Sequence, residues 1–139
     1  MRLLEMLTTD ELKRSIKVKI SELKDIKNVG DIRFEKNIKN GEDGTYIFAD
    51  EQGYHYVQME RGKEQRHKVT DDVFEICFWC LYDLICIASF NYEFENRKEN
   101  INSREAAFNK QLEYLSLLGD NFKKRGEIEI SEILKAHPL

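Results

Sequence analysis

Proline and glycine are scarce in this sequence. One proline and seven glycines in 139 residues leave little room for an elaborate system of catalytic loops. There is no P-loop, no dinucleotide-binding glycine fingerprint, and neither the HExxH nor the GxSxG motif. Acidic residues are plentiful, but nothing marks two of them as a general acid and a general base. We therefore predict no catalytic residue and no cofactor, and a binding protein becomes the leading class.

An excess of basic residues is also missing. The 22 lysines and arginines are outnumbered by 26 acidic residues, which gives a formal net charge of −4 and a pI near 5.5. Nucleic-acid-binding domains are usually basic, so no nucleic acid partner is expected. A mildly acidic protein fits a basic protein partner better. With 35% charged and 41% hydrophobic residues the chain is globular rather than disordered, and its length predicts one domain over residues 1–139.

Cysteines are few and poorly placed for disulfides or metal. Cys77, Cys80 and Cys86 lie close together, and an odd number on one segment is a poor disulfide framework. No metal site is expected either, because the CxxC pair lies inside an apolar helical pattern and the three histidines show no ligand spacing. The N-terminus shows no signal peptide, since charges follow a short apolar stretch. These features predict a cytoplasmic protein with reduced thiols.

Long hydrophobic runs are absent apart from one, Val73–Tyr92, which is long enough to cross a bilayer. Glu75 and Asp83 interrupt this run, and an aspartate near the bilayer midplane would cost roughly 3 kcal/mol. Acids also flank both ends of the run, so we predict no membrane span. The run is instead expected to be the central, largely buried helix of a soluble core, from about Asp72 to Arg97.

Steps of three and four along this helix place charged residues beside large apolar ones. The stripe consists of Trp79, Asp83, Cys86, Phe90, Glu93 and Arg97. One interpretation is that the stripe is simply the solvent-facing edge of the helix. The other, which we favour, is that Glu93 and Arg97 form a partly buried ion pair with a structural role.

Around this helix the sequence predicts an α+β fold. Apolar residues at steps of three and four indicate an amphipathic surface helix from about Thr9 to Lys27. From Asp31 the apolar period changes to two, and turn signals predict an antiparallel β-meander of three to four strands. The turn signals are Asn40–Gly41, Asp43–Gly44, Glu51–Gly53 and Arg61–Gly62. The strand aromatics are expected to cover one face of the sheet, packed on a helix.

Two helices are expected after the central one. Asn102 or Ser103 can cap a helix that ends at Leu118. A last helix is predicted from about Asp120 to His137. The expected order is therefore an N-terminal helix, the antiparallel sheet and three helices, with the long buried central helix first among the three.

From Glu60 onward the sequence resembles a family of bacterial immunity proteins from polymorphic toxin systems, the immunity protein 63 family. The shared motifs are ERG (Glu60, Arg61 and Gly62), E…R (Glu93 and Arg97) and R…F…Q (Arg104, Phe108 and Gln111). The likeness extends over roughly Tyr54 to Pro138. The cysteine-rich "ICFWC" departs from the ordinary apolar residues of the family pattern.

The resemblance implies a non-enzymatic inhibitor that is encoded beside a secreted or contact-dependent toxin. Such proteins bind the C-terminal toxic domain of their cognate toxin and block its active site or an essential surface. Many toxin domains of this kind are nucleases with basic clefts, which an acidic surface would be steered towards. The expected partner is thus a protein, and the chain itself is expected to be a monomer or a weak dimer.

Two sets of residues are candidates for roles in such a protein. The first is the set of polar motif residues, which we expect to form a structural network because polar groups beside apolar stripes usually fix packing. Its members are Glu60, Arg61, Glu93, Arg97, Arg104 and Gln111. The second set, the acidic turns, is the expected contact surface for the toxin. Its members are Glu42, Asp43, Asp50 and Glu51.

Two other functions remain open at this point. A small-ligand-binding protein or an enzyme could use a polar pocket around Glu93, Arg97 and Arg104. A regulatory or oligomeric scaffold could use the lysine-rich outer face of the first helix. Closed side-chain pairing in the first case, and a monomer without partners in the second, would count against these alternatives.

Overall fold

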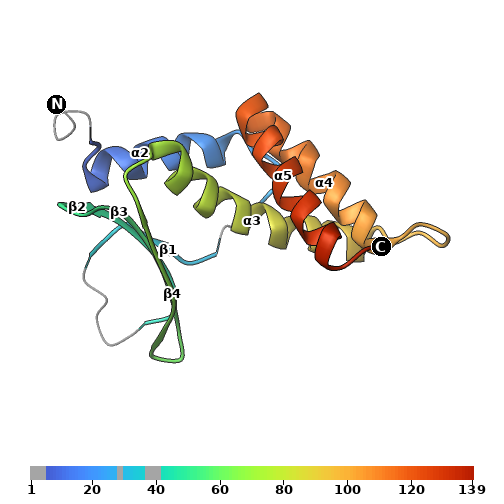
Figure 1. Cartoon of the computed structure of the whole chain (residues 1–139), viewed down its shortest axis with the longest axis horizontal. Helices are drawn as coiled ribbons and strands as arrows, with labels where there is room; N and C mark the ends of the chain where they lie inside the picture. The colour runs from blue at the N-terminus through green and yellow to red at the C-terminus, as the bar shows by residue number, and fades with distance from the viewer. Residues whose placement is uncertain (1–5, 28–29, 37–41) are drawn as a thin grey trace. The chain divides into compact units, whose positions relative to one another are not determined.

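The computed structural model describes residues 6–27, 30–36 and 42–139 (Figure 1). Its elements are α2 (Thr9–Ser21), β1 (Ile32–Arg33), β2 (Gly44–Asp50), β3 (Gly53–Glu60), β4 (Lys63–Thr70), α3 (Val73–Glu95), α4 (Ser103–Leu118) and α5 (Asp120–Ala136). The α+β class and the order of helix, sheet and three helices are confirmed. The turn expected at Asn40–Gly41 lies outside the described residues.

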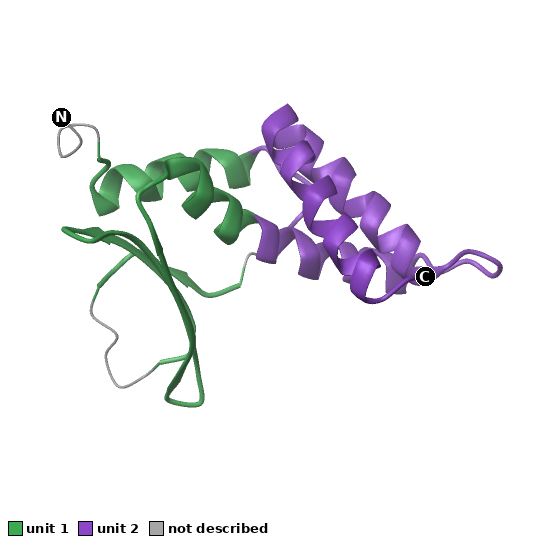
Figure 2. Ribbon diagram, viewed as in Figure 1, with its two compact units in different colours: residues 1–21, 27–81 green, residues 22–26, 82–139 purple. Residues whose placement is uncertain are grey.

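The chain divides into two compact units (Figure 2). Unit 1 comprises residues 1–21 and 27–81, and unit 2 comprises residues 22–26 and 82–139. Helix α3 begins in unit 1 and ends in unit 2. The expectation of one domain over residues 1–139 stays a prediction.

Side-chain caps fix where the helices begin. At α2 the Thr8 amide donates to a Glu11 carboxylate oxygen (2.9 Å) and the Glu11 amide to the Thr8 hydroxyl (3.1 Å), which is a complete capping box. Asp72 accepts from the Phe74 amide before α3 (2.8 Å) and Asn102 from the Glu105 amide before α4 (3.1 Å). Capping residues readable in the sequence therefore set the starts of α2, α3 and α4, whereas α5 begins after Gly119 without a side-chain cap.

Helix α2 ends at Ser21 and not near Lys27 as expected. The Ser21 hydroxyl donates to the Val18 carbonyl (2.5 Å), a local bond of the kind that competes with helix continuation. Leu23 and Ile26 continue the apolar spacing and are buried, but they lie in an irregular segment that belongs to unit 2.

The sheet of unit 1 has the strand order β1-β2-β3-β4. Strands β2, β3 and β4 form the expected antiparallel meander. Strand β1 differs, because it pairs parallel to β2, with Ile32 opposite Thr45 and Arg33 opposite Tyr46. The connection from Arg33 to Gly44 is much longer than a hairpin turn, so the chain can return to the same end of the sheet before β2 begins.

The aromatic side chains of the sheet lie on both of its faces, contrary to the expectation of one face. Successive strand residues point to opposite faces, and the register pairs Tyr56 with Ile47 and Tyr46 with Val57. Tyr56 contacts Trp79 of α3 (ring centroids 6.2 Å apart), whereas Tyr46 belongs to a second buried cluster with Phe48 and Val57. Both faces of this sheet therefore carry buried apolar residues.

Helix α3 is the one helix in the described parts of the chain that is long and apolar enough to cross a membrane, judged by length and composition. Within its most apolar window, 44% of the residues are buried inside the protein. Ile76, Phe78 and Leu81 are at most 1% exposed and form part of the core of unit 1. Helix α3 is therefore partly buried, less so than the largely buried helix that the sequence predicts.

The turn between β2 and β3 requires glycine at position 53. Gly53 has φ +135°, and a Cβ atom there would lie 2.7 Å from the backbone carbonyl oxygen of Thr70. Gly62 has φ +75°, but a Cβ atom there would meet nothing within 4 Å. We expect Gly53→Ala to lower the free energy of unfolding by about 2 kcal/mol, and Gly62→Ala by about 1 kcal/mol. Chemical denaturation of both variants tests this ranking, and equal losses would contradict it.

Candidate functional site

Glu93 and Arg97 form the ion pair that the helical spacing predicts. Arg97 donates from Nε to Glu93 Oε2 (3.0 Å) and from Nη2 to Glu93 Oε1 (2.9 Å), so the guanidinium binds both carboxylate oxygens. The Glu93 side chain is 7% exposed and the Arg97 side chain 56%. The hydrogen bonds from Arg97 lower the pKa of Glu93. The Arg97 guanidinium also lies over the Phe94 ring, 5.5 Å from its centroid.

Two further motif residues of unit 2, Arg104 and Gln111, make hydrogen bonds to other elements of the same unit. Gln111 is 1% exposed and accepts a hydrogen bond from the Tyr82 hydroxyl at 3.4 Å. Arg104 donates to the carbonyl oxygens of His137 (2.7 Å) and Pro138 (3.3 Å), so it fastens the segment after α5 to the first turn of α4. Both contacts join elements that are distant in the sequence.

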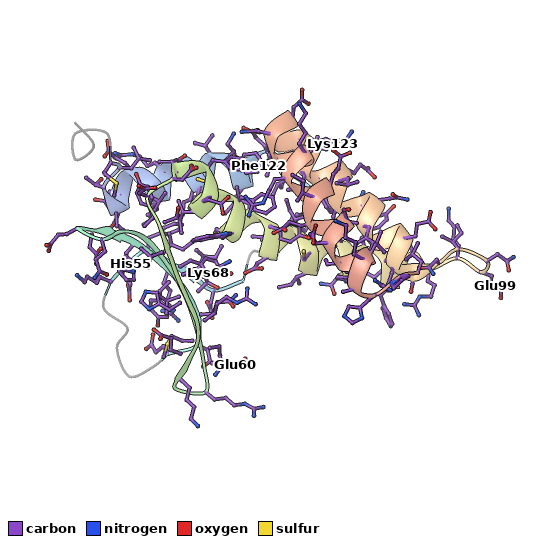
Figure 3. The ribbon with its side chains drawn as sticks, viewed as in Figure 1. His55, Glu60, Lys68, Glu99, Phe122 and Lys123 are labelled. Carbon is purple, nitrogen blue, oxygen red and sulfur yellow. The ribbon has the colours of Figure 1, made fainter. Side chains whose placement is uncertain are left out.

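Glu60 ends strand β3 in unit 1, at the tip of the β3–β4 hairpin (Figure 3). Arg61 follows it in the turn between the two strands. Both side chains are exposed. Arg61 has φ +54°, and its amide donates to a carboxylate oxygen of Asp43 (2.8 Å). The six residues expected to form a network thus make separate contacts, with Glu93 and Arg97 as the pair that bind each other directly. Their structural role stays a prediction.

The acidic turns lie at opposite ends of strand β2. Glu42 and Asp43 precede the strand, whereas Asp50 ends it and Glu51 follows. Seven residues at about 3.4 Å each separate Asp43 from Asp50 by roughly 24 Å, so the four acids do not form one compact patch. Glu42 pairs with Arg33 (3.2 Å), and Glu51 is exposed. Their contact with a toxin stays a prediction.

Asp50 belongs to a chain of polar side chains that crosses the sheet. His55 Nε2 lies 2.7 Å from Asp50 Oδ1, and His55 Nδ1 lies 2.9 Å from His67 Nε2. His67 Nδ1 in turn lies 3.0 Å from Glu64 Oε1. Burial alone would raise the pKa of Asp50, but the hydrogen bonds from His55 and the Gln52 amide hold it below its ordinary value.

Sequence reasoning missed this chain of contacts. His55 is 3% exposed and stacks on the Phe48 ring, with centroids 4.5 Å apart. His67 pairs with Val57 in the sheet register, which places it diagonally across from His55 on the same face. Because the contact depends on strand register, spacing along the sequence could not reveal it.

Metal-ligating groupings and the state of the thiols can be followed through the part of the chain that the structure describes. In the described parts of the chain no three His, Cys, Asp or Glu side chains are grouped to hold a metal ion. Burial raises the pKa of Cys77, and it raises those of Cys80 and Cys86 to about 12. Thiols with such high pKa values hold little of the reactive thiolate.

A small cavity lies at the end of α3. Its volume is about 150 Å³, which is below the usual range for ligand pockets of about 300–1,000 Å³. It is lined by Tyr92, Glu93, Asn96, Arg97, Lys98, Ile101 and Ala106. Arg104 is not among these residues, and Glu93 is closed by its pairing with Arg97. Glu93 and Arg97 therefore line this cavity without Arg104. The three residues do not together form the polar pocket considered for a small ligand or an enzyme.

Comparison with known proteins identifies one family. The family model described as immunity protein 63 matches residues 50–132. No curated protein and no solved structure matches the chain. The matched region is more than half of the sequence and runs from the end of β2 through most of α5, including every motif residue discussed above. The chain belongs to the immunity protein 63 family.

Proposed function

We propose that this protein binds the C-terminal toxic domain of a cognate secreted or contact-dependent toxin and blocks its active site or an essential surface. The observation that carries the proposal is the family match over residues 50–132, since membership of an immunity protein family implies toxin neutralisation. Members of such families are typically not enzymes. The protein would act in the cytoplasm of the producing cell, as a monomer or weak dimer.

A nuclease is the toxin class that the charge of the chain fits best. A domain that cleaves nucleic acid needs a basic cleft for the phosphate backbone. The net charge of −4 on this chain would attract such a cleft. The inhibitor would then occupy the site where the phosphates bind.

The direct test is a binding experiment with the neighbouring gene product. The proposal predicts that a large secreted protein is encoded immediately upstream of this chain, and the C-terminal domain of that protein is the probe. We expect a one-to-one complex with a nanomolar Kd and complete loss of nucleolytic activity in the complex. Absence of a complex at micromolar concentrations would overturn the proposal.

The acidic turns are expected to guide association. Reversing the charge at Asp43 and Glu51 should lower the association rate constant about tenfold at low salt and leave the dissociation rate constant nearly unchanged, because exposed charges act mainly on diffusional encounter. The control is Glu127→Lys with Glu132→Lys, two exposed positions on α5 that change the net charge equally. Stopped-flow association measured at several salt concentrations compares the two double variants, and equal rate constants would exclude the turns as the steering surface.

A further inference from the structure

The part of α3 that lies in unit 2 leaves a row of large apolar residues in solvent. Ile87 is 65% exposed, Phe90 46% and Phe94 73%. Their spacing of three and four places them on one helix face, which we call the apolar face of α3. The other side of the same segment is buried. Its buried residues are Ile85, Ser89 and Glu93.

The apolar face has the size of the centre of a protein interface. An aromatic side chain contributes about 150–250 Å², so the three residues together expose roughly 350 Å². Apolar patches of about 300–600 Å² are the largest on most monomers and are often functional. A standard interface buries about 800 Å² on each partner, with an apolar core inside a polar rim. The face is too small for the obligate dimers that bury more than about 2,000 Å² in total.

The small cavity described above lies next to this face. Arg97, held in place by Glu93, both covers the Phe94 ring and lines the cavity. The cavity has a volume of about 150 Å³, and Ile101, which is 52% exposed, contributes to its wall. A cavity of about this size in another protein accepts one benzene ring. It can therefore receive one aromatic or aliphatic side chain of a partner, as interface anchors usually require.

Charges beside the face indicate the chemistry of its partner. Glu95 at the end of α3 and Glu99 in the following loop (Figure 3) are exposed. Arg97 and Lys98 are the exposed bases of this loop, and the charge of Arg97 is balanced by its pairing with Glu93. An acidic rim disfavours an anionic membrane, which attracts lysine and arginine, and it disfavours a second copy with the same rim.

We propose that the apolar face of α3 and the adjoining cavity are the surface on which the cognate toxin domain docks. This inference rests on the function proposed above and names the contact surface. The toxin contributes an apolar patch, with one side chain in the cavity, and basic residues opposite the acidic rim. The apolar contact sets the dissociation rate constant, because substitution of an anchor residue mainly raises that constant.

The test compares the variants Ile87→Glu and Phe94→Glu with two matched controls. Leu117→Glu on α4 and Ile128→Glu on α5 change side chains that are 56% and 57% exposed in the same unit. Binding to the C-terminal domain of the upstream-encoded protein is measured by surface plasmon resonance. Each α3 variant is expected to raise Kd at least 30-fold through faster dissociation, and each control less than threefold. Circular dichroism melting curves verify that all four variants fold.

The outcomes separate this inference from the proposed function. If the wild type binds the toxin domain and the α3 variants bind as the controls do, the docking surface is wrong and the function stands. If the wild type forms no complex, the function fails and this inference fails with it. Sedimentation velocity and flotation with phosphatidylserine vesicles complete the test. A dimer or a vesicle complex that Phe94→Glu abolishes would assign the face to another occupant and overturn the proposal.

Discussion

Replacing Phe78 by alanine is expected to lower the free energy of unfolding by about 4 kcal/mol, the usual loss for a fully buried phenylalanine. Phe78 is 1% exposed and stacks on Phe74 with ring centroids 6.0 Å apart. Because Phe78 lies in the core of unit 1, its truncation to alanine leaves a cavity that the surrounding side chains cannot fill. Urea denaturation monitored by circular dichroism measures the loss.

The adjacent tryptophan supplies the control for this prediction. Trp79 is larger than Phe78, but it is only partly buried, with the Lys68 ammonium 4.2 Å from its ring centroid. We expect Trp79→Ala to cost about 2–3 kcal/mol, at or below the lower end of the range for buried aromatics. If Trp79→Ala lowers the free energy of unfolding more than Phe78→Ala does, Phe78 is not the more deeply buried of the two side chains, contrary to the structure.

The second large effect is expected at Asp83. Burial raises the pKa of this carboxyl from 3.8 to about 6. The folded protein therefore holds this proton more tightly than the unfolded chain, so the contribution of Asp83 to stability is greatest below pH 4 and falls as the pH rises towards 6. The difference between the two pKa values corresponds to a loss of about 3 kcal/mol in the free energy of unfolding. Partial solvation of the carboxyl group makes this loss smaller.

Asp83→Asn removes this pH dependence. The variant is expected to be about 2–3 kcal/mol more stable than the wild type at pH 8 and nearly equal to it at pH 4. Glu95→Gln, which removes an exposed carboxylate from the same helix, is the matched control and should show no such gain. Thermal unfolding at six pH values between 3.5 and 8 measures both. An equal gain at every pH would show that the effect has another cause.

The elements that sequence reasoning placed correctly are those governed by local geometry. Helix α3 is recognised by its apolar run, and its start is set by Asp72. The Glu93–Arg97 pair follows from a spacing of four residues in one helix, so it needs no tertiary information. The meander of β2, β3 and β4 follows from period-two alternation and turn residues.

The features that sequence reasoning missed depend on how distant segments meet. The parallel pairing of β1 with β2 depends on the path of the chain between the two strands, which no local sequence pattern predicts. The contact between His55 and His67 depends on the register of β3 and β4. The acidic turns were recognised as turns, but their separation along β2 prevents them from forming one patch. Short-range rules therefore identified the secondary structure, and the layout of the candidate surface needed the folded chain.

The low accessibility of the cysteines, two buried and one partly buried, has a practical consequence for spectroscopy. Burial raises the pKa of Cys80 and of Cys86 to about 12, so maleimide dyes react slowly with these thiols at pH 7. A cysteine introduced at the exposed position Leu117 would outcompete all three native thiols for the dye. Protein that carries a single fluorophore, for measuring toxin encounter in real time, can therefore be prepared without first replacing the native cysteines.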